Sequence, residues 1–397
     1  MTDATQSECL VPQSSDPLTF GFQSLTRLIV GPGSVARLGG LGRELGASRV
    51  LVVSDPGIVE AGHAAAGVES LEAEGIATAV FSAFTENPST LEVEAGTAVA
   101  RRFRPDLLVG LGGGSSMDCA KGINFLFSCG GRMQDYRGHH TATGPMLPSI
   151  AVPTTAGTGS ETQSFALITD SDSGAKMACG DPRAAFRVAI LDVNLTLTQP
   201  LSLVALTGID AASHAVESHV STAATPVSRM FSREAWRLLA GHLPGVFVDG
   251  GSSIAARSAV QLGAALAGCA IENSMLGAAH ALANPLTAVH GVIHGQAVGV
   301  MLPHVVRFNS HACGTGYGEL LGEIGIDADA ATAGERLSAW LADLLRASRL
   351  KTSLSACSIP APDIGSLATL AAAQWTRSFN PRPVTAADLA MIYEAAR

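Results

Sequence analysis

Four histidines and one aspartate in the second half of the chain have the residue types and spacing of a metal site. Asp210 and His214 lie four residues apart in the segment Gly208–Glu217, a spacing that places both side chains on one face of a helix. The neighbouring residues are small and apolar, so we expect burial, and a buried aspartate requires a partner charge. A metal ion would supply that charge; a hydrogen-bonded Asp–His pair without metal is the alternative that this segment leaves open.

Three further histidines follow in a mostly apolar stretch: His280, which ends a long helical pattern, and then His290 and His294. Neutral imidazoles are good ligands for divalent iron or zinc. Two pairs could complete the ligand set begun by Asp210 and His214: His280 with His294, or His290 with His294. Spacing alone does not decide between these pairs. His219 lies five residues after His214, off the face of the pair, and is interpreted as a surface or core residue.

Two loops rich in glycine and hydroxyl groups have the composition of a dinucleotide-phosphate site. Gly110–Asp118 follows a strand pattern and opens a helical one, so its backbone N–H groups and the helix N-terminus would face a pyrophosphate. It departs from the G-x-G-x-x-G pattern because Ser115 replaces the last glycine, and a tight strand-to-helix turn is the alternative. The second loop, Pro153–Glu161, offers hydroxyl groups suited to phosphate or ribose: Thr154, Thr155, Thr158 and Ser160.

Asp55 comes at the end of the first strand pattern. A carboxylate at that place accepts hydrogen bonds from the adenosine ribose and repels a 2′-phosphate. The sequence therefore predicts NAD rather than NADP as the cofactor, although Asp55 before Pro56 would also suit a simple turn.

The elements that must position these residues change character near residue 198. Before it, strand patterns at 49–54, 78–82, 106–111 and 188–192 alternate with helical ones, such as 117–127, which is typical of a parallel α/β sheet. After Pro200, helical patterns dominate at 201–221, 228–242, 254–283 and 333–349. We therefore predict a loose tail over residues 1–17, a Rossmann-like NAD-binding α/β domain over 18–198 and an all-helical, metal-binding catalytic domain over 199–397.

Composition excludes several other classes of function. The net charge of −9 argues against a nucleic-acid partner, which needs a basic face. Seven scattered cysteines contain no Cys-x-x-Cys pair, so neither a disulfide framework nor a thiolate zinc site is indicated. The N-terminus lacks the pattern of a signal peptide, and no apolar run approaches the roughly 20 residues that span a bilayer. The expected location is the cytoplasm.

Five motifs together resemble the iron-containing, group III alcohol dehydrogenases over nearly the whole chain, from about Phe20 to Arg397. They are G-G-G-S-S-M-D-C-A-K, P-T-T-A-G-T-G-S-E, D-A-A-S-H-A-V-E, A-A-H-A-L-A-N-P and H-G-V-I-H-G. Their order and separation agree with that family. The resemblance implies a dehydroquinate synthase-like architecture, with the active site between an N-terminal α/β domain and a C-terminal helical domain.

The resemblance also implies the roles of single residues. The metal ligands would be Asp210, His214, His280 and His294, which decides against His290. Iron(II) is the expected ion and zinc the alternative. The cofactor contacts would be Asp55, Asn87, Gly113, Gly114, Ser115, Asp118, Thr154, Thr155, Thr158 and Lys176.

The chain departs from the resemblance at one position beside the expected metal. Many members of the family carry a histidine four residues after the third ligand, and this chain has Asn284, which does not titrate near neutral pH. His290 stands where many members have another residue type. We hypothesise that His290 partly replaces the missing imidazole as a proton relay; a packing role is the alternative.

The expected activity is reversible hydride transfer between NAD and a small alcohol or aldehyde, with the metal acting as a Lewis acid on the substrate oxygen. A homodimer or larger homo-oligomer is expected from the resemblance. Two alternatives remain: a zinc-type polyol enzyme resembling glycerol dehydrogenase, and a catalytically weak NAD-binding sensor or assembly protein.

Overall fold

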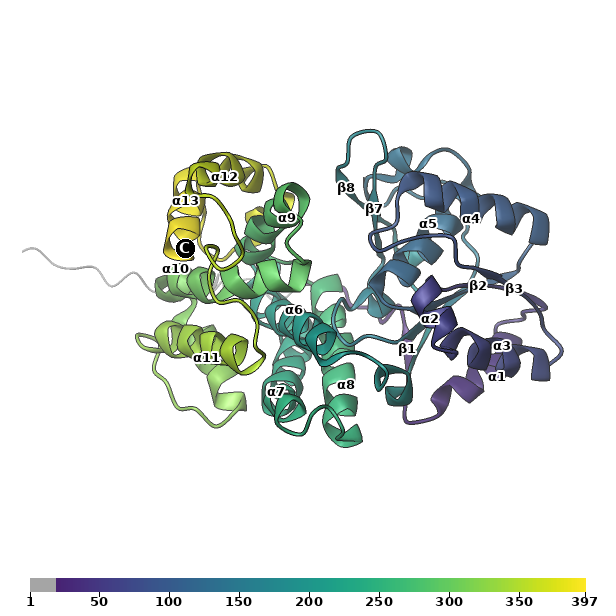
Figure 1. Cartoon of the computed structure of the whole chain (residues 1–397), viewed down its shortest axis with the longest axis horizontal. Helices are drawn as coiled ribbons and strands as arrows, with labels where there is room; N and C mark the ends of the chain where they lie inside the picture. The colour runs from purple at the N-terminus through teal and green to yellow at the C-terminus, as the bar shows by residue number, and fades with distance from the viewer. Residues whose placement is uncertain (1–18) are drawn as a thin grey trace, which may run out of the picture.

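A parallel sheet and a bundle of helices lie side by side in the computed structural model, which describes residues 19–397 (Figure 1). The tail predicted over residues 1–17 lies outside the described residues. The main sheet has six parallel strands in the order β1-β9-β6-β4-β2-β3. Their bounds are β1 Arg27–Val30, β2 Arg49–Val53, β3 Ala77–Phe81, β4 Leu107–Gly112, β6 Ser149–Pro153 and β9 Val188–Leu191.

Helices cover both faces of this sheet (Figure 1). Apolar residues of α1 and α3 pack with one face, and those of α4 and α5 with the other. Strand β4 is buried along its whole length, which explains its unbroken apolar sequence. The helices are α1 Leu38–Glu44, α2 Pro56–Glu60, α3 His63–Ala73, α4 Thr90–Phe103 and α5 Gly114–Cys129.

A second, smaller sheet has the order β5-β8-β7, and strand patterns did not predict it. Its members are β5 Gly138–His139, β7 Phe165–Thr169 and β8 Lys176–Gly180, and β7 pairs antiparallel with β8. The antiparallel pair places Lys176 opposite Thr169. Lys176 is the first residue of β8, directly after the loop that joins the two strands.

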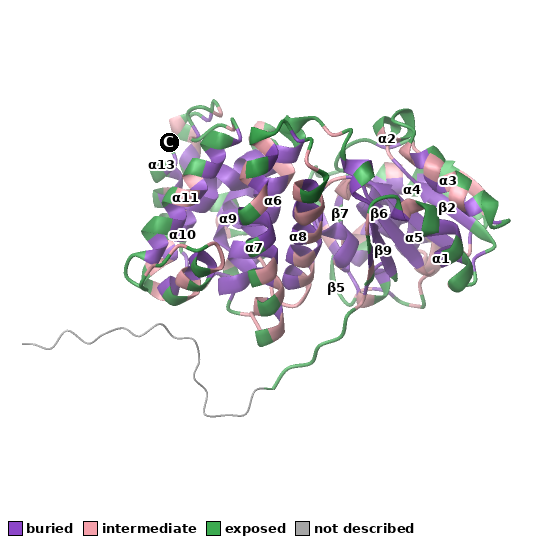
Figure 2. Cartoon of the chain, turned by 90° about the horizontal axis from the view of Figure 1, so that it is seen from below, coloured by how far each residue is buried: buried purple, intermediate pink, exposed green. Residues whose placement is uncertain are grey.

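The second half is helical, so the predicted fold class is confirmed. Its helices are α6 Leu201–Val220, α7 Pro226–Val248, α8 Ile254–Glu272, α9 Ala278–His290, α10 His294–Glu323, α11 Ala333–Ala347, α12 Ile364–Ala372 and α13 Ala386–Ala395. Every residue of α6 from Gly208 to Val220 is buried (Figure 2). A helix that is enclosed on all sides must be apolar or must satisfy its polar groups internally.

Helix α8 is long and apolar enough to cross a membrane by length and composition alone. It packs against α6 and α7 and against the short turn Ser160–Thr162. The hydroxyl of Thr162 donates a hydrogen bond of 2.9 Å to the Ala265 carbonyl inside this contact. These contacts account for its apolar composition.

One prediction about the helices is wrong. The pattern over 254–283 was expected to form one helix ending at His280, but α8 ends at Glu272 and α9 begins at Ala278. At the break, Gly277, the N-cap of α9, adopts φ −121° and ψ −142°, outside the helical region. His280 therefore lies in the first turn of a helix instead of in the last.

Candidate functional site

The four candidate metal ligands come from three helices that pack on one another. Asp210 and His214 lie one turn apart on α6, His280 lies in the first turn of α9, and His294 is the first residue of α10. Helix α10 contacts both α6 and α9. The packing of these helices thus brings together side chains that are up to 84 residues apart in the chain.

Three imidazoles surround the Oδ1 atom of Asp210. The Nε2 atoms of His214, His280 and His294 lie 3.4, 3.5 and 3.7 Å from that oxygen. The ligand atoms of Asp210, His280 and His294 all lie within 4.8 Å of one another. The ring of His214 stacks on that of His280, with centroids 4.9 Å apart. Donors at these separations suit arrangement around a common ion.

Among the residues that the structure describes, two of these atoms are buried without a hydrogen-bond partner: Oδ1 of Asp210 and Nε2 of His280. A buried polar atom without a partner costs about 1–3 kcal/mol. Such atoms in a native structure require an explanation, and an ion is one of the recognised ones. A divalent cation would satisfy both at once, and the set of one carboxylate and three imidazoles matches the preferences of iron and zinc. The residues therefore fit the expected metal.

The ionisation of the cluster also suits metal binding. Burial disfavours the Asp210 carboxylate, but the neighbouring His214 and His280 outweigh it and hold the pKa of Asp210 well below its usual range. Burial lowers the pKa of His214 to about 4. Burial also lowers the pKa of His294, and Lys176 contributes to that lowering. Asp210 is thus ionised and these two imidazoles neutral at pH 7, the states in which they bind a metal.

His280 behaves differently. Burial alone would lower its pKa, but the nearby carboxylates of Asp210 and Glu217 raise the pKa of His280 to about 9. A cation arriving beside Asp210 must therefore displace a proton from this imidazole.

The two predicted phosphate loops lie against each other at the carboxyl ends of β4 and β6. Gly112 at the end of β4 is opposite Pro153 at the end of β6, and the Thr154 N–H donates a hydrogen bond of 2.9 Å to the Gly112 carbonyl. A Cβ atom on Gly114 would come within 2.8 Å of Thr158. Only glycine therefore allows the loops to approach this closely.

This junction has the properties of a site for an anionic dinucleotide. Gly114 is the first residue of α5, a helix of 16 residues whose N-terminus favours negative charge. The hydroxyl of Thr154 is buried and lacks a hydrogen-bond partner within the described residues. In open parallel sheets, ligands bind outside the carboxyl ends of the strands. The chain thus fits NAD at this junction.

The predicted cofactor residues from other strands lie around the start of α5. Asp55 follows β2, caps α2 by accepting from the Ile58 N–H at 3.2 Å, and accepts from the Ser116 hydroxyl at 3.0 Å. The Ser115 hydroxyl accepts from the Asn87 N–H at 3.2 Å.

Lys176 reaches the same region from β8. Its ammonium donates to the side-chain oxygen of Asn87 at 2.9 Å. Its positive charge also contributes to the lowered pKa of His294. The Lys176 ammonium therefore contacts a predicted cofactor residue and is within electrostatic range of the metal cluster.

Asp118 contacts the second loop directly. Its Oδ1 atom accepts a hydrogen bond of 2.7 Å from the Ser160 hydroxyl, and the buried Lys121 donates to the Ser160 carbonyl at 2.7 Å. These contacts attach α5 to the loop that follows β6. Lys121 is a residue that the sequence analysis did not single out.

Asn284 and His290 occupy different parts of α9. Asn284 follows His280 by one turn, and its side-chain amide donates a hydrogen bond of 3.0 Å to Gln374. His290 is the last residue of α9, and its Nε2 atom lies 3.4 Å from the Asp363 carboxylate. Asn284 therefore lies one helical turn after the expected ligand His280, whereas the imidazole of His290 faces Asp363 at the other end of α9.

Sequence reasoning missed Glu217, whose carboxylate accepts a hydrogen bond of 2.6 Å from Nδ1 of His280. A signal was present, because Glu217 follows Asp210 by seven residues, or two helical turns, and therefore shares its face of the helix.

Comparisons with known proteins agree with this arrangement. Residues 26–193 match the sequence profile of the family described as iron-containing alcohol dehydrogenase, and residues 204–397 match the C-terminal profile of the same family. The NAD-dependent methanol dehydrogenase of Bacillus methanolicus is 34% identical over 371 residues, which cover 93% of this chain and 97% of that protein.

Two solved structures share the fold over nearly the whole chain. The crystal structure of a 1,3-propanediol oxidoreductase superposes with a TM-score of 0.90 and 32% identity, covering 93% of this chain and 97% of that one. The sulfoacetaldehyde reductase of Bifidobacterium kashiwanohense, in complex with NAD+, gives a TM-score of 0.86 at 26% identity, with coverage of 96% and 99%.

Proposed function

This chain belongs to the iron-containing alcohol dehydrogenase family. From that premise we propose which of its residues bind the metal and the cofactor and which substrates it converts. It is an NAD-linked, metal-dependent alcohol dehydrogenase. The proposed metal ligands are Asp210, His214, His280 and His294. The observation that carries this assignment is the convergence of three imidazoles on the buried Asp210, with Oδ1 of Asp210 and Nε2 of His280 unpartnered.

The proposed cofactor residues surround the start of α5. The glycine backbone there and the helix N-terminus would hold the pyrophosphate. Asp55, fixed by Ser116, would accept from the adenosine ribose. Lys176, which donates to Asn87 and whose charge acts on His294, would orient the nicotinamide half of the cofactor toward the metal cluster.

Bound at these places, the divalent ion would polarise the substrate oxygen as a Lewis acid and NAD would accept or donate the hydride. The chain's own residues supply the geometry. Asp210 holds a negative charge in the cluster, and His214 and His294 present neutral imidazoles. Asn284 is held by Gln374 one turn beyond His280, where its amide would hydrogen-bond the substrate.

We propose small alcohols and the corresponding aldehydes as substrates. The support is the activity of two relatives, a methanol dehydrogenase and a sulfoacetaldehyde reductase. A cytoplasmic location and a homodimer or larger homo-oligomer stay predictions from the sequence. The zinc-type polyol enzyme differs from the present proposal in its substrate, which is measurable.

The test is elemental analysis of anaerobically purified protein, paired with NADH oxidation on a panel of short aldehydes. We expect about one iron or zinc per chain. His280→Ala should lose the metal and lower kcat/KM by about a thousandfold or more, since Lewis-acid polarisation is worth several kcal/mol. His311→Ala, which changes an exposed histidine, is the matched control and should leave both unchanged.

A protein that binds NAD but neither holds a metal nor oxidises NADH would contradict the assignment and favour the sensor hypothesis. Retention of metal in His280→Ala would show that the ligands are wrongly assigned even if the enzyme is active.

A further inference from the structure

Helix α6 carries a third ionisable residue on the face that holds Asp210 and His214. Glu217 follows them after a further three residues, so the three side chains form one stripe along two helical turns. Glu217 is 5% exposed. Its carboxylate forms an ion pair with His280.

The two oxygens of Glu217 make two short hydrogen bonds to α9. Oε2 accepts from Nδ1 of His280 at 2.6 Å, and Oε1 accepts from the Ala279 N–H at 2.6 Å. An ionised carboxylate only accepts, so Nδ1 of His280 must carry its proton. The other ring nitrogen, Nε2, then points to Asp210 at 3.5 Å. One side chain thus sets both the tautomer and the direction of a ligand ring.

The start of α9 is fixed by side chains from outside the helix. Its N-cap, Gly277, makes no side-chain cap. Glu217 takes the Ala279 N–H, and Oδ1 of Asn380 accepts from the Ala278 N–H at 3.3 Å. A Cβ on Gly277 would lie 3.0 Å from Oε1 of Glu217 and 3.1 Å from Oδ1 of Asn380. The glycine therefore leaves the space in which these two caps reach the backbone.

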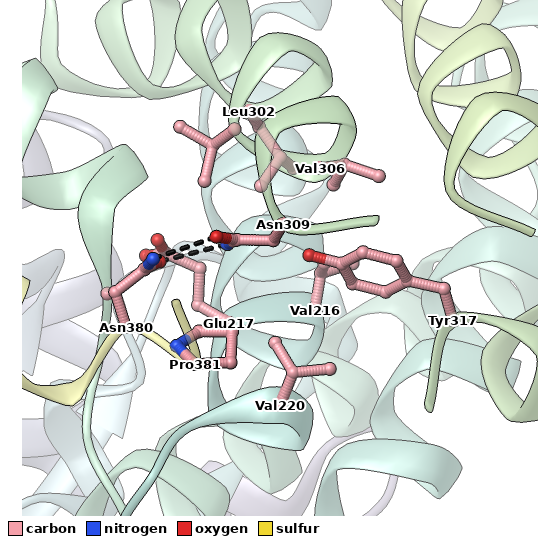
Figure 3. A pocket seen from close by; sticks show the side chains of 11 residues that line it. Val216, Glu217, Val220, Leu302, Val306, Asn309, Tyr317, Asn380 and Pro381 are labelled. Atoms are coloured by element: carbon pink, nitrogen blue, oxygen red, sulfur yellow. Dashed lines mark hydrogen bonds between the residues drawn. The ribbon is translucent and has the colours of Figure 1, made fainter. Parts of the chain in front are cut away.

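Figure 3 shows the surroundings of this contact, a small cavity beside Glu217. Asn309 and Asn380 join their amides by two hydrogen bonds of 2.9 and 2.8 Å next to the carboxylate. The remaining wall is mainly apolar, with Val216, Val220, Leu302, Val306 and the ring of Tyr317. Hydrogen bonds in such low-dielectric surroundings are stronger than in water.

We propose that Glu217 is a positioning residue of the metal site: it holds His280 as the tautomer protonated at Nδ1, with Nε2 directed to the ion, and fixes the first turn of α9. The proposal rests on the proposed function, because it takes His280 as a ligand. Outer carboxylate partners of ligand histidines fix ring orientation and raise ligand basicity, and their loss typically costs about 10- to 100-fold in metal affinity or activity.

The decisive variant is Glu217→Gln, which has nearly the same volume. Both oxygens of Glu217 face donors, but an amide offers only one acceptor. If its NH₂ group faces Nδ1 of His280, that nitrogen must lose its proton and Nε2 must carry one, which blocks it as a ligand. If the NH₂ group faces the Ala279 N–H, two donors oppose each other. Either arrangement weakens the site.

The measurement is the dissociation constant of the metal-free full-length protein for Zn²⁺, by competition with a chromophoric chelator. Co²⁺ loading provides a second readout through its visible absorption. We expect Glu217→Gln to weaken Zn²⁺ binding about 10- to 100-fold and to change the Co²⁺ spectrum, while the affinity for NAD is unchanged. Glu217→Asp, which keeps the charge but is one methylene shorter, should fall between Glu217→Gln and the wild type.

Glu319→Gln is the matched control, because Glu319 forms another glutamate–histidine contact, at 3.0 Å to Nε2 of His219. It should leave Zn²⁺ affinity and the Co²⁺ spectrum unchanged. A Glu217→Gln variant that is folded and binds both ions like the wild type would overturn the proposal while leaving the proposed function intact. Absence of Zn²⁺ and Co²⁺ binding by the wild type would instead contradict the proposed function itself.

Discussion

The hydroxyl of Ser116 donates a hydrogen bond of 3.0 Å to Oδ2 of Asp55 and accepts one of 3.2 Å from the Asp55 backbone N–H. These reciprocal bonds join the carboxyl end of β2 to the first turn of α5, across 61 residues of sequence. They hold the carboxylate beside the helix N-terminus where we place the pyrophosphate. The position of Asp55 is thus set by a neighbouring strand–helix unit.

Cofactor choice should depend on this carboxylate. Asp55→Asn removes the negative charge that would oppose a 2′-phosphate. We expect the ratio of kcat/KM for NADH to that for NADPH to fall about tenfold or more, measured with one aldehyde at constant ionic strength. Ser116→Ala should shift the ratio in the same direction by less, because the charge remains but its support is lost. An unchanged ratio in Asp55→Asn would place the ribose elsewhere.

The close approach at Gly277 predicts an indirect effect on the metal. In Gly277→Ala the added Cβ would press on Oε1 of Glu217 and Oδ1 of Asn380. We expect weaker Zn²⁺ binding and a lower melting temperature, since both caps of α9 must shift. Gly40→Ala, at a helical glycine with no heavy atom near the added Cβ, is the control and should not reduce either quantity. Normal Zn²⁺ affinity in Gly277→Ala would mean that His280 does not need a fixed start of α9.

Glu161 predicts a pH dependence of stability that does not involve the metal. Burial raises the pKa of Glu161 to about 7 from the model-peptide value of 4.5. A raised native pKa contributes stability that is complete below the unfolded value and is lost as the pH rises through the native one. Glu161→Gln removes this titration. Its free energy of unfolding relative to wild type should therefore increase between pH 4.5 and 7.5.

The size of that increase should reach about 3 kcal/mol, because one pKa unit is worth about 1.4 kcal/mol. Denaturant unfolding of the metal-free proteins at several pH values measures it. A difference between the two proteins that stays constant over this range would show that Glu161 does not titrate there.

His290 provides a test of the proton-relay hypothesis. It lies ten residues, or about 15 Å of helix, beyond His280, and its ring faces Asp363. We expect His290→Ala to keep the pH profile of kcat within about half a pH unit of wild type, a margin below the one-unit scatter typical of histidine pKa values in proteins. A profile that loses its limb near neutral pH would support the relay and require a path from His290 to the substrate.

Much of this molecule was predictable because its signals are local. The alternation of strand and helix patterns before residue 198 depends on residue periodicity, and the six parallel strands confirm the α/β class. The four-residue spacing of Asp210 and His214 fixes their common helix face without any knowledge of the rest of the fold. The family resemblance rests on five ordered motifs, and the family profiles confirm it.

Other features were not local, and sequence reasoning either missed them or left them open. The hairpin of β7 and β8 has no strong alternating pattern, yet it delivers Lys176 to Asn87. The break before α9 needs Glu217 and Asn380 as caps, and those residues are 60 or more positions away from it in sequence.

The histidines show the division most clearly. By itself, the sequence determined that His280, His290 and His294 were candidate metal ligands, because residue type and apolar context can be read from each residue and its neighbours in the chain. Spacing along the chain left the choice among them open, and the family resemblance only implied it. The tertiary structure shows that the imidazoles of His280 and His294 meet at Asp210 while that of His290 turns to Asp363. The physical reason is that a distance between side chains on different helices depends on how those helices pack, and the spacing of residues along the chain does not encode that packing directly.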